Sequence, residues 1–216
     1  MNFKEIKHII WDWNGTLVDD AQLCVDIMNG IRAKRSLSPI SLENYRETFD
    51  FPVIEYYRRI GFDLEKESFE ILSNEFINGY IASRKNVQLQ QGALDALNYF
   101  RKRNLPQCML SATQLETLKQ TLDEYGIEHY FKTVLGLEHH YADGKGHLGE
   151  TWLKKNPIEP KHVLFIGDTL HDLDVANTMG INCLLVAKGH HSKERLESAQ
   201  VTVINDLKEL ITIFKA

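Results

Sequence analysis

The chain of 216 residues is 43% hydrophobic, which is enough to bury a core as one domain or as one domain with a modest insertion. Its formal net charge of −5 and the lack of a basic run disfavour nucleic acid as a partner. No segment is long and apolar enough for a membrane span or a signal peptide, and the three scattered cysteines show no disulfide or zinc spacing, which together favour a cytoplasmic location.

The first predicted strand is the short apolar run of residues 9–11, which is followed by Asp12 and the turn signal Asn14-Gly15. An apolar run without alternation is typical of a strand buried on both faces of a parallel sheet. Asp12 then lies at the carboxyl end of this strand, where open α/β sheets bind their ligands. A carboxylate in such a place costs free energy unless it is paired or holds a metal, so we expect a partner beside Asp12.

The segment 18–86 shows helical patterning and no strand, whereas helices and strands alternate from about residue 91. The predicted helices cover about residues 20–31, 41–60 with a break at Pro52, 64–84, 93–102, 115–125, 148–155 and 172–179, and Asp206 caps a last helix. The later predicted strands cover residues 106–110, 133–135, 162–166, 182–186 and 201–204. Alternation of this kind predicts a parallel sheet with helices on both faces. The sequence thus predicts an α/β fold, with a Rossmann-like parallel-sheet core (1–17 and 87–216) and an inserted α-helical cap (18–86).

Three further groups of polar residues lie where predicted strands end. Ser111-Ala112-Thr113 follows one strand and precedes a helix, whose N-terminus would favour a phosphate group. Lys145 lies in a polar loop between a strand and a helix, a flexible place for a cation. Asp168 ends the next strand, and Asp172 follows it by four residues. Because parallel strands end at one edge of a sheet, we expect these groups to meet near Asp12.

In order along the chain, these four segments resemble the motifs of the haloacid dehalogenase (HAD) superfamily. The family patterns are Asp-x-Asp-x-Thr, matched by residues 12–16 except at Asn14, then a Ser or Thr after a strand, a Lys, and Gly-Asp-x-x-x-Asp. The helical insert resembles in length and position the cap of the phosphoglycolate-phosphatase-like branch. The resemblance implies a Mg²⁺-dependent phosphohydrolase that acts on a small phosphorylated metabolite through an aspartyl-phosphate on Asp12.

The resemblance also implies a role for each matching residue. Asp12, the backbone carbonyl of Asn14 and Asp168 would hold Mg²⁺, which prefers oxygen ligands. Lys145 would offset charge on the phosphoryl oxygens, and Asp172 would hold a metal-bound water or orient Lys145. The residues expected to bind the substrate are Gly15, Thr16, Ser111, Ala112, Thr113 and, from the cap, Arg46.

Asn14 departs from the family pattern at the second Asp, which protonates the leaving oxygen and later deprotonates the attacking water. An amide can do neither. The chain is therefore expected to be a weak phosphatase, best on acyl or aryl phosphates, whose leaving groups need no proton. Alternatives are a catalytically silent protein that binds a phosphorylated ligand or a protein partner, and deamidation at Asn14-Gly15 that restores the Asp. A dehalogenase is disfavoured because its family pattern lacks Asp168.

Other polar residues are interpreted as structural. Asp19 and Asp20 are expected to be helix caps rather than catalytic groups. The histidine pairs 139–140 and 190–191 are expected to be solvated loop residues, and His171 to lie in a loop. Arg58 and Arg59 are expected to be solvated, which leaves Arg46 as the best cap residue to contact a substrate anion. The substrate itself and the oligomeric state stay open.

Overall fold

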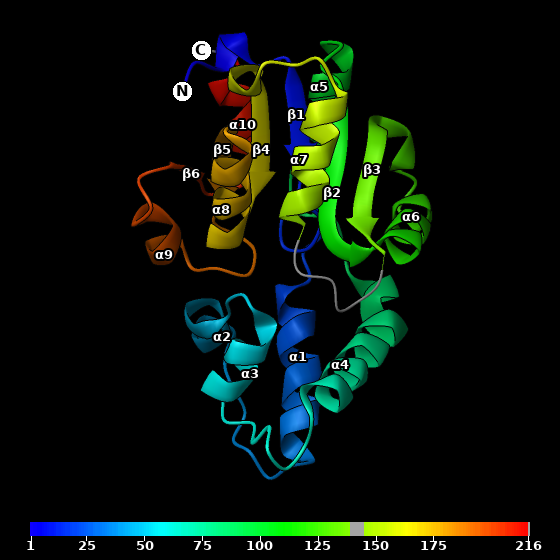
Figure 1. The fold of residues 1–216 in the computed structure, drawn as a ribbon, viewed down its shortest axis with the longest axis vertical. Helices are drawn as coiled ribbons and strands as arrows, with labels where there is room; N and C mark the ends of the chain where they lie inside the picture. The colour runs from blue at the N-terminus through cyan, green and yellow to red at the C-terminus, as the bar shows by residue number, and fades with distance from the viewer. Residues whose placement is uncertain (139–144, 216) are drawn as a thin grey trace.

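A six-stranded parallel sheet forms the centre of the computed structural model, which describes residues 1–138 and 145–215 (Figure 1). The strands are β1 (His8–Trp11), β2 (Gln107–Gln114), β3 (Phe131–Leu137), β4 (Val163–Gly167), β5 (Asn182–Val186) and β6 (Thr202–Ile204). Their order, β3-β2-β1-β4-β5-β6, confirms the predicted α/β class. The chain leaves β1 towards β2 and β3 and returns to β4 on the other side of β1, so the strand order reverses between β1 and β4. Ligands bind at such a reversal in open α/β sheets.

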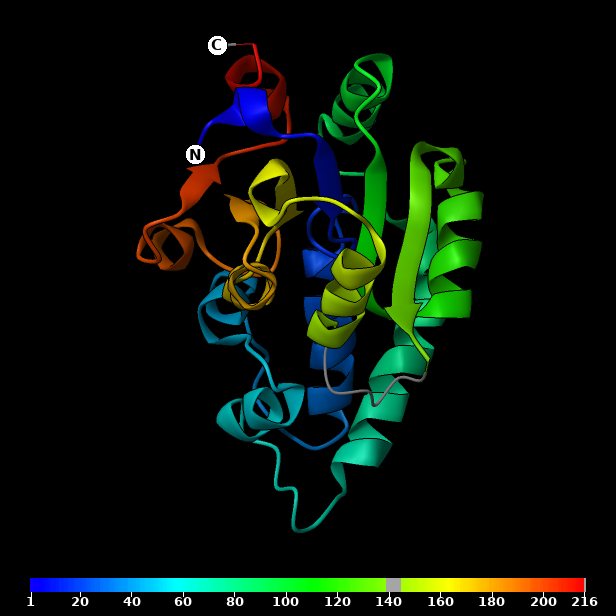
Figure 2. The ribbon, with the colours of Figure 1, turned by 45° about the horizontal axis from the view of Figure 1, so that its top comes forward.

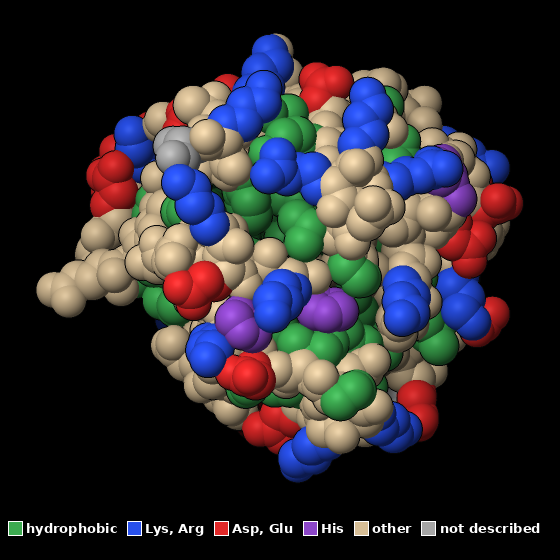
Figure 3. Space-filling view, turned by 90° about the horizontal axis from the view of Figure 1, so that it is seen from above, with side chains coloured by type: hydrophobic (Ala, Val, Ile, Leu, Met, Phe, Trp, Pro, Cys, Tyr) green, Lys and Arg blue, Asp and Glu red, His purple; other side chains and the backbone are tan. Residues whose placement is uncertain are grey.

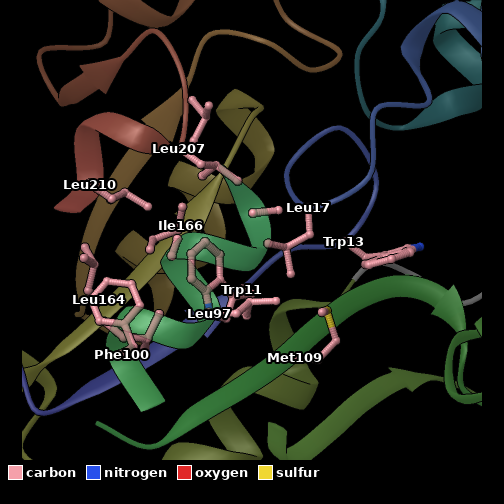
Figure 4. Close-up of a cluster of buried hydrophobic side chains, with 14 of the residues drawn as sticks. Trp11, Trp13, Leu17, Leu97, Phe100, Met109, Leu164, Ile166, Leu207 and Leu210 are labelled. Carbon is pink, nitrogen blue, oxygen red and sulfur yellow. The ribbon is translucent and has the colours of Figure 1, made fainter. Parts of the chain in front are cut away.

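Two helical layers cover the two faces of the sheet. One layer contains α5 (Ala93–Lys102), α6 (Leu115–Glu124) and α10 (Lys208–Ile213), which pack on Trp11, Leu164 and neighbouring side chains (Figure 4). The other layer contains α7 (Gly146–Lys155), α8 (Leu170–Met179) and α9 (Lys193–Glu197), which pack on Ile10 and Phe165. Successive residues of β1 therefore serve opposite faces, as the alternation of side chains along a strand requires.

Four helices lie beyond the carboxyl edge of the sheet and share a hydrophobic cluster of their own (Figure 1). They are α1 (Ala21–Ala33), α2 (Leu42–Thr48), α3 (Val53–Arg59) and α4 (Phe69–Ser83). The chain enters and leaves this group through a two-stranded neck, where Val18 and Leu89 form an antiparallel bridge. In the neck, Asp19 N donates to Gln88 O at 2.9 Å, and Gln90 N donates to Leu17 O at 2.8 Å. The boundaries of the cap at residues 18 and 86 stay a prediction.

The two chain termini lie together at the end of the molecule opposite these four helices (Figure 2). Phe3, in the short helix η1 (Phe3–Glu5), packs on Phe214 with the ring centroids 5.1 Å apart. Seen from that end, basic side chains are interspersed with acidic, histidine and apolar ones (Figure 3). The other short helices are η2 (Arg84–Asn86), η3 (Glu128–Tyr130) and η4 (Pro160–His162). In the part of the chain that the structure describes, no helix has the length and apolarity to cross a bilayer.

The structure corrects the predictions for Ser111–Thr113 and for His171. β2 continues to Gln114, which pairs with Leu137 of β3 beyond a register shift, so Ser111, Ala112 and Thr113 belong to the strand instead of opening α6. Gln114 caps α6 by accepting from Thr117 N. His171 lies in the first turn of α8 instead of in a loop.

The interpretation of His190 and His191 as solvated is also wrong, because they are 6% and 0% exposed. The loop after β5 turns inward, and His191 Nδ1 accepts a hydrogen bond from Leu170 N at 3.1 Å. The other predicted pair, residues 139–140, lies outside the described residues. Burial, followed by the charge of Arg195, lowers the pKa of His191 to about 4.

We expect the His191 ring to make stability depend on pH. Its pKa is lower in the folded chain than the ordinary 6.5, so the unfolded chain binds more protons between pH 6.5 and 4. Its contribution to the free energy of unfolding is therefore complete above pH 6.5 and is lost as the pH falls towards 4, by at most about 3 kcal/mol. Urea denaturation at several pH values should give a shallower pH dependence for His191→Asn than for wild type. Identical slopes would contradict this assignment.

We expect Trp11 to stabilise the sheet through its hydrogen bond as well as through the packing of its ring. Trp11 Nε1 donates to the buried Gln107 Oε1 at 2.9 Å, so Trp11→Phe leaves that acceptor unsatisfied and also removes ring atoms from the core. The free energy of unfolding should fall by about 2–4 kcal/mol in urea denaturation. Trp152→Phe is the matched control, because the Trp152 indole N–H has no hydrogen-bond partner within residues 1–138 and 145–215. Equal losses in the two variants would rule out a special role for the hydrogen bond.

Candidate functional site

The candidate site lies at the carboxyl ends of β1 and β4, where the strand order reverses. Trp11 pairs with Ile166, and Asp12 N then donates to Ile166 O at 2.9 Å. This pairing carries Asp12 and Asp168, which each follow a buried strand, to the same edge of the sheet. The parallel register thus explains why residues 156 positions apart in sequence lie side by side.

Three carboxylates converge at this edge. Asp12, Asp168 and Asp172 each offer an oxygen within 4.8 Å of the others, and they are 7%, 0% and 1% exposed. The Thr16 hydroxyl donates to Asp168 Oδ1 at 2.7 Å and to Asp12 Oδ2 at 3.3 Å. Asp172 Oδ2 accepts from Asp168 N and from both the backbone and the hydroxyl of Thr169, at 2.7 to 3.1 Å, as part of the cap of α8.

Lys145 is the cation of this cluster. It is 3% exposed at the N-terminal end of α7, so it is buried instead of lying in a flexible loop. Its Nζ forms ion pairs with Asp12 Oδ1 and with Asp172 Oδ1, the latter at 2.6 Å, and lies 5.1 Å from the ring centroid of Phe165. Burial alone would lower the pKa of Lys145, but the two carboxylates outweigh it and raise the pKa above its usual value.

Burial dominates the protonation of the carboxylates. It raises the pKa of Asp12 to about 8 against the attraction of Lys145, and the charges of Asp172 and Asp168 add to the rise. Burial likewise raises the pKa of Asp168 to about 6. At Asp172 burial is outweighed by Lys145 and by hydrogen bonds, which hold the pKa below its usual value. Three buried acids beside one lysine are electrostatically under-compensated, so these oxygens fit a hard divalent cation such as Mg²⁺.

Glycine is required at two points where backbone approaches Asp168. Gly15 has φ +74°, and a Cβ atom there would collide with the Asp168 carboxylate and the His190 ring. A Cβ atom on Gly189 would collide with the same carboxylate. Gly15 was predicted from the turn pattern, whereas Gly189 gives no such signal because its neighbours in the sequence form no recognised motif. Both loops therefore pack their backbone directly against Asp168.

Of the predicted substrate-binding residues of β2, Thr113 contacts Asn14. Ser111 Oγ accepts from Thr113 N at 3.1 Å, and Thr113 Oγ1 donates to Asn14 Oδ1 at 2.9 Å. Ala112 lies between them in the strand. Arg46 is placed differently, because Nε donates to Gly189 O at 2.8 Å and Nη2 donates to Lys188 O at 3.0 Å. Its guanidinium therefore ties α2 to the loop after β5 instead of reaching the three carboxylates.

The sequence interpretation missed a second buried charge pair. Asp20 is 0% exposed and stands at the cap position of α1, but its side chain makes no cap hydrogen bond. Its Oδ1 lies 3.3 Å from His190 Nε2, and Cys24 contributes a sulfur nearby, so the three side chains form a second group that could hold a metal. Burial alone would lower the pKa of His190, but Asp20 raises it to about 9. The only sequence signals were the Asp19-Asp20 and His190-His191 pairs.

Two similar proteins from other organisms are named phosphoglycolate phosphatase. Phosphoglycolate phosphatase 1 of Pseudomonas aeruginosa is 24% identical over 213 residues, which cover 94% of this chain and 78% of that protein. Phosphoglycolate phosphatase of Chromobacterium violaceum is 23% identical and covers 100% of this chain and 99% of its own.

Solved structures share the fold. A predicted phosphatase from Clostridium acetobutylicum superposes with a TM-score of 0.81 at 18% identity, over 98% of this chain and 99% of that one. A haloacid dehalogenase-like hydrolase from Streptococcus pneumoniae gives 0.73 at 21% identity, with the same coverage. The family model described as haloacid dehalogenase-like hydrolase matches residues 9–186, which include all four motif segments. The chain therefore belongs to the haloacid dehalogenase-like hydrolase family.

Proposed function

We propose that the chain is a Mg²⁺-dependent phosphatase that hydrolyses a small phosphorylated metabolite through an aspartyl-phosphate on Asp12. The observation that carries the proposal is the meeting of Asp12, Asp168, Asp172 and Lys145 at the strand-order reversal. Relatives named phosphoglycolate phosphatase support the same reaction class, and they make phosphoglycolate the first substrate to test. Asp12, Asp168 and the Asn14 carbonyl would hold Mg²⁺, which would offset the charge of an incoming phosphoryl group.

The residues of the chain suit this reaction. Asp12 attacks phosphorus, so that its carboxylate oxygen forms the new P–O bond as the bond to the leaving oxygen breaks. Lys145 remains an ammonium, because Asp12 and Asp172 raise its pKa, and it offsets charge on the phosphoryl oxygens. Ser111 and Thr113 place two hydroxyl groups at the end of β2, which would have to turn from their present acceptors, Thr113 Oγ1 and Asn14 Oδ1, to donate to a phosphoryl oxygen. Attack of water on phosphorus then releases phosphate and restores Asp12.

The Asn14 side chain limits the rate in this proposal. Its amide carries no proton that it can release to a leaving oxygen, and both amide hydrogens are directed at Asp20 Oδ2 and Tyr80 Oη, at 2.6 and 2.8 Å. General acid–base help is typically worth about 10²–10⁴-fold. We therefore infer faster turnover of acyl and aryl phosphates than of alkyl phosphates.

The Gly15 amide, which would have to attack the Asn14 side chain for deamidation, already donates to Asp20 Oδ1 at 2.8 Å.

Helices α1–α4 form the proposed cap, residues 18–86, which would cover the site and exclude water during the reaction. The three cysteines are free and buried, which is compatible with the reducing cytoplasm proposed as its location. The alternative, a catalytically silent protein that binds a phosphorylated ligand, rests on Asn14 alone.

We expect Asp12→Asn to abolish Mg²⁺-dependent phosphate release, because the amide cannot act as the nucleophile. A screen of acetyl phosphate, p-nitrophenyl phosphate, phosphoglycolate, sugar phosphates and nucleotides should show a fall of about 10³-fold or more on every active substrate. Asp174→Asn is the matched control, because Asp174 is an exposed carboxylate on α8 that belongs to no buried cluster. Equal activity of wild type and Asp12→Asn would refute the nucleophile, and a wild type without turnover would favour the silent alternative.

We expect an acid at position 14 to help only when Asp20 is changed with it. In Asn14→Asp alone, the new carboxyl group lies against Asp20 Oδ2, and the two buried acids repel. In the double variant Asn14→Asp with Asp20→Asn, the amide introduced at position 20 donates to the carboxylate introduced at position 14. The hydrogen bond between the two side chains is therefore kept, with donor and acceptor exchanged. Compared with Asp20→Asn alone, which shares the loss of the Asp20 charge, the double variant should raise kcat on an alkyl phosphate by about tenfold or more, while Asn14→Asp alone loses stability. No gain over Asp20→Asn would contradict the rate-limiting role of Asn14.

A further inference from the structure

The Asn14 side chain is fixed by three partners from different parts of the chain. Its Nδ2 donates to Asp20 and to the Tyr80 hydroxyl, and its Oδ1 accepts from Thr113 Oγ1. An amide has two N–H groups, so none is left to contact a substrate in this arrangement. Tyr80 belongs to helix α4, beyond the edge of the sheet, so the loop after β1 is bonded directly to that helix.

Asp20 is the centre of this network. Its Oδ2 accepts from Asn14 Nδ2 and, at 2.7 Å, from the Tyr80 hydroxyl. Its Oδ1 accepts from Gly15 N at 2.8 Å and lies 3.3 Å from His190 Nε2. A carboxylate has about four acceptor sites, and these four partners occupy them. The same count disfavours a metal at Asp20, Cys24 and His190, because a metal would have to displace one of the donors.

His190 extends the network to the acidic cluster and to a second cap helix. Its backbone N donates to Asp168 Oδ2 at 2.7 Å. Its Nδ1 and the Tyr45 hydroxyl of α2 share a hydrogen bond of 2.9 Å. Gly189 permits the close approach, because any side chain there would strike Asp168. His190 thus bonds Tyr45 of α2 through its ring and Asp168, a proposed Mg²⁺ ligand, through its backbone N–H.

We propose that Asp20 and His190 form a clasp with Tyr45 and Tyr80, and that the clasp positions the Asn14 loop and Asp168 only when helices α2 and α4 are docked. These four are positioning residues, since they act through Asn14 and Asp168 instead of touching the reacting atoms. The inference rests on the proposed phosphatase function for its catalytic consequence, but the clasp itself is defined by hydrogen bonds. Hydrogen bonds to a charged, buried group are strong enough to make docking and site order interdependent.

The cap helices offer a matched set of variants. Tyr80→Phe and Tyr45→Phe each remove one hydroxyl of the clasp. Tyr56→Phe is the control, because Tyr56 is a 1% exposed residue of α3 whose hydroxyl has no hydrogen-bond partner in the described part of the chain. All three changes remove one tyrosine hydroxyl from a cap helix, so any general effect of that loss is shared.

Hydrogen exchange tests the clasp without requiring turnover. In peptides covering residues 12–20 and 186–192, we expect Tyr80→Phe to speed exchange in the first and Tyr45→Phe in the second, each about tenfold. Tyr56→Phe should leave both peptides as in wild type. Unchanged exchange in both clasp variants, or the same increase in the control, would overturn the proposal.

Steady-state kinetics with acetyl phosphate and Mg²⁺ tests the consequence for the reaction. We expect Tyr80→Phe to lower kcat about tenfold while KM changes less than about twofold, and to cost little more in an Asp20→Asn background, because Tyr80 acts through Asp20. A raised KM with unchanged kcat would overturn positioning and assign Tyr80 to substrate binding. If wild type shows no turnover, the proposed function fails, and the exchange measurement still decides the clasp.

Discussion

Asp12, Asp168 and Asp172 lie close enough to repel one another, and the Lys145 ammonium is bonded to two of them. Burial makes this repulsion costly, which is why the pKa values of Asp12 and Asp168 rise while that of Asp172, next to Lys145 and the start of α8, falls. A divalent cation shared among these oxygens would offset the repulsion. The surrounding backbone is arranged to keep the carboxylates in place despite that cost.

That arrangement depends on close packing of two loops. The loop after β1 and the loop after β5 both bring a glycine against Asp168, and Asp20 with His190 bonds the two loops to each other. One anion, Asp20, and one imidazole, that of His190, whose pKa is raised, therefore lie beside the acidic cluster. Tyr45 and Tyr80 reach this pair from outside the sheet, so its order is shared with α2 and α4.

Much of the fold and the acidic cluster was predictable, because the information is local. The apolar runs before Asp12 and Asp168 identify buried parallel strands, and the topology rule places their ends together. The end of β2 was not predictable in this way, because Gln114 is held by pairing with Leu137 of β3, beyond a register shift that contains Ser111–Thr113, and not by a pattern in the sequence. The pairing of Asp20 with His190 was hidden for a similar reason. These residues are 170 positions apart, and only the inward turn of the loop after β5 brings them together.

The neck formed by Val18 and Leu89 has a consequence for how such a protein can diversify. The path into the four outer helices and the path out of them are neighbours, joined by backbone hydrogen bonds on either side of that bridge. An inserted segment whose two ends are neighbours can be lengthened, shortened or exchanged without altering the register of any strand. The acidic cluster could thus be inherited unchanged while helices α1–α4 are replaced by a different segment. What such an exchange would have to recreate is Asp20, which lies just after Val18, and a pair of hydroxyls that reach Asp20 and His190.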